Sequence, residues 1–143
     1  MAHIELLMCL LAGCAGGLVG TLWSGTVSAV ALEKLRARGT GEWHRETVAR
    51  LAAGALLYGS CGAALGFLFW LGWGLVALVD VHWLAVGLAF GALCWAGGAL
   101  PALGMLQLRL REPRHLAVVL AVEWLVACLA VGVLCALTWH RIT

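Results

Sequence analysis

The chain has 143 residues, of which 64% are hydrophobic and 11% are charged. Soluble domains carry nearer a quarter charged residues, and a soluble fold of this length leaves too much surface exposed to hide so many apolar side chains. The composition therefore excludes a soluble protein and predicts a single transmembrane domain over residues 1–143, with the lipid bilayer as its partner. The net charge of +2 gives no reason to expect nucleic-acid binding.

Four apolar runs are each longer than the roughly 20 residues that a helix needs to cross the hydrocarbon core. They cover residues 6–32, 51–79, 83–108 and 116–139. Only helices satisfy their own backbone hydrogen bonds in lipid over such lengths, so the runs predict an all-α membrane protein, an antiparallel four-helix transmembrane bundle. The first run is expected to be a retained span, because its leader MAHIE has no Lys or Arg and the run is too long for a signal peptide.

Basic residues predict how the chain is threaded through the membrane. They follow the first and third runs, and a single one lies beyond the fourth: Lys34, Arg36, Arg38, Arg45 and Arg50; Arg109, Arg111 and Arg114; and Arg141. By the positive-inside rule the two basic connections are cytoplasmic, which puts both termini on the outer (periplasmic) side of a bacterial cytoplasmic (inner) membrane. The connection between the second and third runs is only Asp80, Val81 and His82, which predicts that these runs form a tight antiparallel pair.

Small residues recur every four positions and predict where helices meet. The first run carries two stripes, and the second and third runs repeat the spacing: Gly13, Gly17, Thr21 and Gly25; Gly16, Gly20, Ser24 and Ser28; Gly59 and Ala63; Gly62 and Gly66; Gly87 and Gly91. In lipid, close approach of backbones across small side chains supplies the attraction between helices. We expect helix-packing contacts at Gly13, Gly17, Gly20, Gly25, Gly59, Gly62 and Gly66. Of the two stripes on the first run, we expect one to serve the intrachain bundle and the other a dimer.

The first and third runs contain a similar short segment. GTLWSG covers residues 20–25 and GALCWAG covers residues 91–97, and both segments run toward a basic connection and a returning span. A duplicated hairpin with parallel orientation would leave this pattern. Chance similarity in a chain rich in Gly, Ala, Leu and Trp would leave it too, and both explanations stay open.

One acid, Glu123, lies inside an apolar run. It is four or five residues from the midpoint of the fourth run, about 7 Å toward the cytoplasmic side at the helical rise per residue. Counting the other runs to that depth predicts an intramembrane polar layer of Glu123, Trp23, Ser24, Tyr58 and Ser60. A charged side chain is costly there, so Glu123 should face the bundle interior. It could act as polar glue between helices, or as a protonatable site in a transport path.

Other chemistry-bearing residues show no catalytic pattern. All six cysteines lie inside the apolar runs and none forms a C-x-x-C motif, which argues against a thiol oxidoreductase working at the membrane surface. His3, His82 and His140 fall at the outer face and are weak candidates for metal ligands, because their spacing has no motif character. The sequence therefore predicts no enzyme activity, no cofactor and no metal.

Two stretches carry a resemblance to a known family. GLVGTLWSG (residues 17–25) and VEWLVACLAVGVLCALTW (residues 122–139) resemble an uncharacterised, domain-of-unknown-function family of small bacterial four-span membrane proteins with a Gly-x-Leu-Trp first span. The resemblance covers the layout of the whole chain. It implies the four-span fold and no particular activity.

Two functional hypotheses follow from these observations. The first is a non-enzymatic multi-pass inner-membrane protein that acts by helix packing, as an accessory subunit of a membrane-protein partner or as a homo-oligomer. The alternative is a small carrier or lipophile-binding bundle in which Glu123 is a protonatable site. The doubled stripe of small residues and the short connections favour the first hypothesis.

Overall fold

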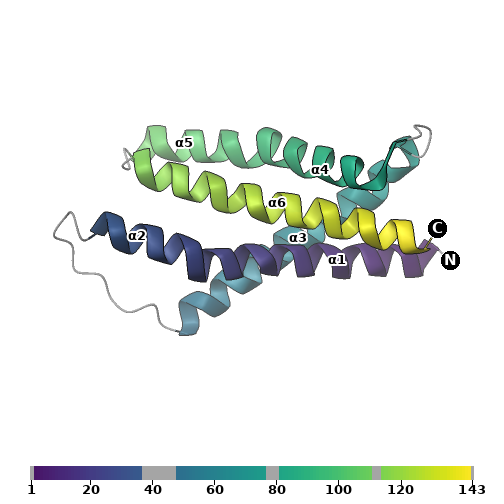
Figure 1. Ribbon diagram of the computed structural model, residues 1–143, viewed down its shortest axis with the longest axis horizontal. Helices are drawn as coiled ribbons and strands as arrows, with labels where there is room; N and C mark the ends of the chain where they lie inside the picture. The colour runs from purple at the N-terminus through teal and green to yellow at the C-terminus, as the bar shows by residue number, and fades with distance from the viewer. Residues whose placement is uncertain (1, 37–47, 77–80, 111–113, 143) are drawn as a thin grey trace.

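The computed structural model describes residues 2–36, 48–76, 81–110 and 114–142, all in helices apart from the two residues that precede α4. In chain order the elements are α1 (Ala2–Trp23), the π-helical turn η1 (Ser24–Ser28), α2 (Ala29–Arg36), α3 (Val48–Val76), α4 (Trp83–Cys94), the π-helical turn η2 (Trp95–Ala99), α5 (Leu100–Leu110) and α6 (Arg114–Ile142). Each π-helical turn joins the α-helices on either side of it, so α1–η1–α2 and α4–η2–α5 are two continuous helices (Figure 1).

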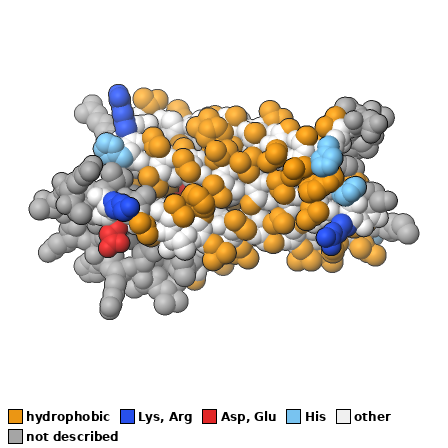
Figure 2. Space-filling view, in the orientation of Figure 1, with side chains coloured by type: hydrophobic (Ala, Val, Ile, Leu, Met, Phe, Trp, Pro, Cys, Tyr) orange, Lys and Arg blue, Asp and Glu red, His pale blue; other side chains and the backbone are white. Residues whose placement is uncertain are grey.

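Four of these helices are long and apolar enough to cross a membrane. The candidate spans are His3–Ser28, Ala52–Gly72, Trp83–Leu108 and Arg114–Ile142. Figure 2 shows apolar side chains around the middle of the molecule, with basic and histidine side chains toward its two ends. The chain is therefore a multi-pass helical membrane protein. Both termini lie at the same end (Figure 1), and the side of the membrane that they face stays a prediction.

Several residues used to predict the threading lie outside the described part of the chain. These are residues 77–79 of the second predicted span, Asp80, and the basic residues within 37–47 and 111–113.

Two of the four spans are central and two are peripheral. The helices pack side by side in the order α3, α1, α6, α4. The α1 helix therefore packs against both α3 and α6, and α6 packs against both α1 and α4. In the spans formed by α1 and α6, 33% of the most apolar stretch is buried, against 22% for α3 and 11% for the span that begins with α4. A core cluster of buried side chains lies between these helices: Cys9, Phe69, Val131, Cys135 and Ala136.

The predicted tight pair of the second and third spans is wrong. Among the described residues α3 lies mainly along α1, and α4 lies mainly along α6. The α3 and α4 helices meet through Phe69 and Phe90, whose rings pack edge to face with centroids 5.1 Å apart. A short connection brings together only the ends that it joins. The small residues farther along each helix determine which neighbour it packs against.

The two π-helical turns occur in the two segments that are similar in sequence. The turn η1 starts immediately after Trp23, and η2 starts at Trp95. A π-helical turn accommodates one extra residue in a helix, and such turns are rare enough to be informative. Their presence in both segments agrees with a duplicated hairpin, in which α1–η1–α2 with α3 corresponds to α4–η2–α5 with α6.

Candidate functional site

A hydrogen bond between two buried side chains connects the first hairpin to the last helix. The Tyr58 hydroxyl, on α3, donates to Oε1 of Glu123, on α6. Glu123 is 4% exposed and Tyr58 is 7% exposed. The carboxyl group therefore faces the inside of the helix assembly, where a hydrogen bond offsets part of the cost of burying it.

Two glycines on α1 allow the Tyr58 side chain to reach α6. A methyl group at Gly17 would overlap the carbonyl oxygen of Tyr58, so the α3 backbone lies directly against α1 at this level. A methyl group at Gly20 would lie 3.1 Å from Cδ1 of the Tyr58 ring and 2.7 Å from Cβ of Ala127. The absence of a side chain at Gly20 thus leaves the room in which the ring passes α1 toward Glu123.

The Trp124 side chain packs against the tyrosine of this hydrogen bond. Its ring packs on the Tyr58 ring with centroids 4.9 Å apart and planes inclined by 38°. Trp124 is not among the residues of the predicted polar layer. The position next to Glu123 in sequence was the available signal, because it places the indole at the same depth.

The other members of the predicted polar layer lie apart from the carboxyl group. Ser60 is exposed, and its hydroxyl donates to the carbonyl oxygen of Leu57 in its own helix, 3.0 Å away. Trp23 and Ser24 are half-buried, and neither forms a side-chain hydrogen bond to Glu123 in the part of the chain that the structure describes. Thr21, one turn from Gly17, is buried, and its hydroxyl oxygen has no hydrogen-bond partner among the described residues.

Four glycines form the contact between α1 and α3, which we call the glycine seam: Gly13, Gly17, Gly62 and Gly66. A methyl group at Gly13 would overlap the Gly62 carbonyl oxygen, and one at Gly62 would overlap the Gly13 carbonyl oxygen. A methyl group at Gly66 would likewise overlap the carbonyl oxygen of Cys9. The two backbones are therefore in direct contact over two helical turns, an arrangement that only glycine allows.

A second glycine contact joins α4 to α6. A methyl group at Gly87 would lie 2.7 Å from the Gly132 carbonyl oxygen, and one at Gly91 would lie 2.6 Å from the Cys128 carbonyl oxygen. When GTLWSG is aligned with GALCWAG, Gly87 and Gly91 occupy the positions of Gly16 and Gly20, which face α6 and lie outside the glycine seam.

Both small-residue stripes of the first span are used within the chain. Gly13 and Gly17 face α3, while a methyl group at Gly16 would lie 2.5 Å from Cα of Val131, on α6. Gly20 also faces α6. The expectation that one stripe serves a dimer is therefore wrong at these positions.

Two glycines predicted at helix contacts lie elsewhere. A methyl group at Gly59 would meet nothing within 4 Å, although the Gly59 carbonyl oxygen accepts a hydrogen bond from the Cys14 thiol at 3.4 Å. Gly25, in η1, is exposed. The Gly59 backbone lies beside Gly17 of α1, and it is the Cα–H side where a methyl group would be added that faces open space.

Trp95 makes a hydrogen bond between the π-helical turn η2 and α6. Its indole Nε1–H donates to the carbonyl oxygen of Ala121 at 2.8 Å. An indole N–H within an apolar span needs a hydrogen-bond partner, and the sequence alone does not identify this carbonyl group.

Three histidines, His3, His82 and His140, lie at the end of the molecule that holds the termini. The rings of His82 and His140 both pack on Trp83, with centroids 5.6 Å and 5.9 Å from it. In the described ranges no three His, Cys, Asp or Glu side chains come together in a way that could hold a metal ion, so His3, His82 and His140 do not form such a group. The six cysteines are unpaired, and Cys135 donates weakly to the Cys9 carbonyl oxygen at 3.7 Å.

Comparisons of the chain with protein families, with curated proteins and with solved structures give no match. The family resemblance of the two short stretches therefore identifies no family. What the sequence and the structure support together is a small membrane protein with four spanning helices.

Proposed function

We propose that this protein is a non-enzymatic multi-pass membrane protein that acts by helix packing, as a homo-oligomer or as an accessory subunit of another membrane protein. The observation that carries the proposal is the exposed small-residue surface of η2 and α5. A methyl group at Gly97, Gly98 or Gly104 would meet nothing within 4 Å, and all three glycines are exposed.

The glycines of η2 and α5 differ from those of α1, which contact neighbouring helices. Gly13, Gly16, Gly17 and Gly20 all lie against a neighbouring helix. Glycine lowers helix stability relative to alanine, so glycines facing only lipid bring a cost without a contact. Close approach of another helix would supply that contact. The span that contains these glycines is also the least covered, with 11% of its most apolar stretch buried.

The same proposal places the protein in the cytoplasmic membrane of a bacterium with both termini outside. Its support is the asymmetric distribution of Lys and Arg along the sequence, which follows the positive-inside rule. A helical hairpin pair of this kind needs no soluble domain to associate with a partner, because the contact surface lies within the bilayer.

In this proposal Glu123 acts as polar glue. Its bond to Tyr58 connects α6 to α3, two helices that otherwise share few contacts. The alternative, a small carrier in which Glu123 is a protonatable site, is favoured by one observation: the buried carboxyl group lies in an apolar stretch that holds no Lys or Arg. An intramembrane acid of this kind is a functional hypothesis by default.

The mass of the protein in nanodiscs tests the packing proposal. We expect the purified full chain to occur above the monomer mass of 15.1 kDa, as an oligomer or with a co-purifying partner. Gly98→Leu should reduce that association, because the larger side chain blocks close approach. Gly54→Leu is the matched control, since a methyl group at Gly54 also meets nothing within 4 Å. A wild-type protein that is strictly monomeric and brings no partner would contradict the proposal.

A further inference from the structure

The π-helical turn η2 changes which residues of the third span face α6. Before the turn, Gly87 and Gly91 are buried against α6. After it, Ala99 and Leu103 are half-buried, and among the described residues η2 and α5 pack mainly against α6. Gly98, by contrast, is exposed. The face that packs on α6 therefore passes from the two glycines to Ala99 and Leu103 and leaves Gly98 outside.

One extra residue in η2 causes this change of face. Three turns of an α-helix take about 11 residues, so residues with that spacing point in nearly the same direction. Gly98 lies 11 residues after Gly87, and an unbroken α-helix would turn it toward α6. Ala99 lies 12 residues after Gly87 and takes that direction because the π-helical turn holds one residue more. In η2 the Leu100 N–H donates to the Trp95 carbonyl oxygen, five residues back instead of four.

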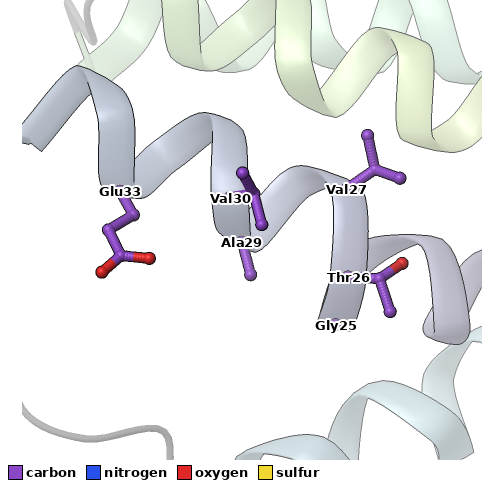
Figure 3. A pocket seen from close by; sticks show the side chains of 6 residues that line it. All are labelled: Gly25, Thr26, Val27, Ala29, Val30 and Glu33. Carbon is purple, nitrogen blue, oxygen red and sulfur yellow. The ribbon is translucent and has the colours of Figure 1, made fainter.

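The first span has the same spacing but a different residue at the exposed position. Ser28 lies 12 residues after Gly16 and is buried, and η1 also contacts α6. Val27 lies 11 residues after Gly16 and is exposed, and it lines a surface pocket with Gly25, Thr26, Ala29, Val30 and Glu33 (Figure 3). Val27 thus takes the place that Gly98 has in the third span. Valine holds two helix backbones apart, whereas glycine lets them touch.

The third span can therefore pack on α6 in two ways. In the structure, Ala99 and Leu103 face α6, and the small residues Gly98 and Ala102 are exposed. If η2 became α-helical, α5 would turn by about 100°, the rotation of one helical residue. Gly98 and Ala102 would then face α6 and continue the glycine contact of α4. Their small side chains allow the close backbone approach that such a contact needs.

Pro101 favours the packing that the structure shows. Proline has no N–H, and in a regular α-helix its ring clashes with the carbonyl group four residues back, which here belongs to Gly97. An α-helical η2 would bear that clash in full. The indole of Trp95, bonded to the Ala121 carbonyl oxygen at 2.8 Å, holds the start of the turn against α6. The α4 helix thus stays in place while α5 turns.

We infer that η2 is a switch that controls access to the small-residue surface of η2 and α5. In the π-helical form, Gly98 and Ala102 are exposed and can meet a helix of another chain. In the α-helical form, the same two residues face α6 and are closed to that helix. The control of access rests on the proposed function, because it concerns the same surface. The two packings of α5 do not depend on it.

Photo-crosslinking of the full chain in nanodiscs measures which packing is present. A diazirine-bearing amino acid replaces Ala102 or Leu103, and crosslinks within one chain are mapped by mass spectrometry. Without a further change, position 103 should crosslink to α6, and position 102 mainly to lipid or to a partner. Pro101→Ala should raise the ratio of α6 crosslinks at position 102 to those at position 103 by about tenfold, because the clash that opposes the α-helical turn is gone.

Deleting Ala96 in the Pro101→Ala background is the matched control. The deletion takes out the extra residue, so an unbroken α-helix again directs Leu103, and not Ala102, to α6. This double variant should return the crosslink ratio to the wild-type value. It should also associate in nanodiscs as the wild type does, whereas Pro101→Ala alone should associate less.

The switch is overturned if Pro101→Ala leaves the crosslink ratio at the wild-type value, or if the deletion of Ala96 does not return it. Weaker association of Pro101→Ala with an unchanged ratio also overturns the switch, and the proposed function then stands without it. If the ratio changes as expected but the wild type is strictly monomeric and brings no partner, the two packings of α5 are confirmed and the proposed function is contradicted.

Discussion

The two helical hairpins use the same kind of contact but differ in what lies on the other side of their first helix. In the first hairpin, Gly13 and Gly17 of α1 meet α3, and in the second, Gly87 and Gly91 of α4 meet α6. The α1 helix carries two more glycines on a neighbouring face, Gly16 and Gly20, and these bring α6 against it. On α4 the neighbouring contact is made by a phenylalanine, Phe90, which meets Phe69 edge to face.

This difference explains why α1 is central and α4 is peripheral. Glycine lets two backbones touch, whereas a pair of aromatic rings with centroids 5.1 Å apart separates the helices that carry them. The contact between α1 and α6 is therefore extensive, and that between α3 and α4 is limited to one end. Two similar hairpins thus associate asymmetrically, and one face of η2 and α5 is left exposed.

The largest effect is expected from adding a methyl group within the glycine seam, where the α1 and α3 backbones touch. Gly62→Ala places a methyl group on the Gly13 carbonyl oxygen and should lower the free energy of unfolding by about 1–3 kcal/mol, the usual cost of overpacking. Gly87→Ala should cost less, because its nearest atom would be 2.7 Å away and a second neighbour is the Ala136 methyl group. Unfolding by SDS in mixed micelles, followed by circular dichroism, measures both values.

The control for this experiment is an alanine where there is space. A methyl group at Gly54 meets nothing within 4 Å, so Gly54→Ala should be neutral or raise the free energy of unfolding by up to about 1 kcal/mol through helix propensity. If Gly62→Ala were as stable as Gly54→Ala, the α1–α3 seam would not be the close contact that distinguishes the first hairpin.

The bond between Tyr58 and Glu123 connects the two hairpins, and breaking it should have an intermediate effect. Glu123→Leu and Tyr58→Phe should each cost about 0.6–2 kcal/mol, the range for hydrogen bonds between membrane helices. Glu123→Gln should be close to the wild type, because the amide oxygen still accepts from the Tyr58 hydroxyl. The double variant Tyr58→Phe/Glu123→Leu should cost less than the sum of the single variants, since both remove the same bond.

The same variants separate the two hypotheses for Glu123. If Glu123 is a protonatable site in a carrier, Glu123→Gln should abolish proton-coupled transport as fully as Glu123→Leu, because neither side chain exchanges a proton. Equal losses of stability for Gln and Leu would instead show that the Tyr58 bond needs the carboxyl group itself.

Counting residues along each span predicted well how deep each residue lies in the membrane, and predicted poorly toward which neighbour its side chain points. It placed Glu123 and Tyr58 at one level, and in the structure they are hydrogen-bonded. It also placed Ser60 there, yet Ser60 is two residues from Tyr58 and therefore turned about 200° around the helix axis. For the same reason a methyl group at Gly59 would point into open space, although the Gly59 backbone lies beside Gly17. The depth of a residue follows from its position along the span. Whether its side chain contacts another helix depends on which helices are neighbours.

The order of the helices was the part of the fold that the sequence could not supply. The number and the apolar character of the spans follow from composition and run length. Neighbours in sequence do pack together within each hairpin, α1 with α3 and α4 with α6, but the two hairpins meet mainly through α1 and α6 and not through the expected pair of α3 and α4. The glycine stripes on α1 were visible beforehand. Their partners on α6, Val131 and Ala127, have no small-residue signature that would single them out.

The smallest effect is expected at the two tryptophans of the similar segments, and it tests whether these segments make the same contact with α6. Trp95→Phe removes the indole N–H that donates to the Ala121 carbonyl oxygen at 2.8 Å, and it should cost about 0.6 kcal/mol, the average for such bonds in membranes. Trp23 is half-buried and has no corresponding bond among the described residues, so Trp23→Phe should change the free energy of unfolding by less. The same SDS titration compares them, because each substitution keeps an aromatic ring. Equal losses at the two positions would mean that ring packing, not the hydrogen bond to α6, accounts for the effect at Trp95.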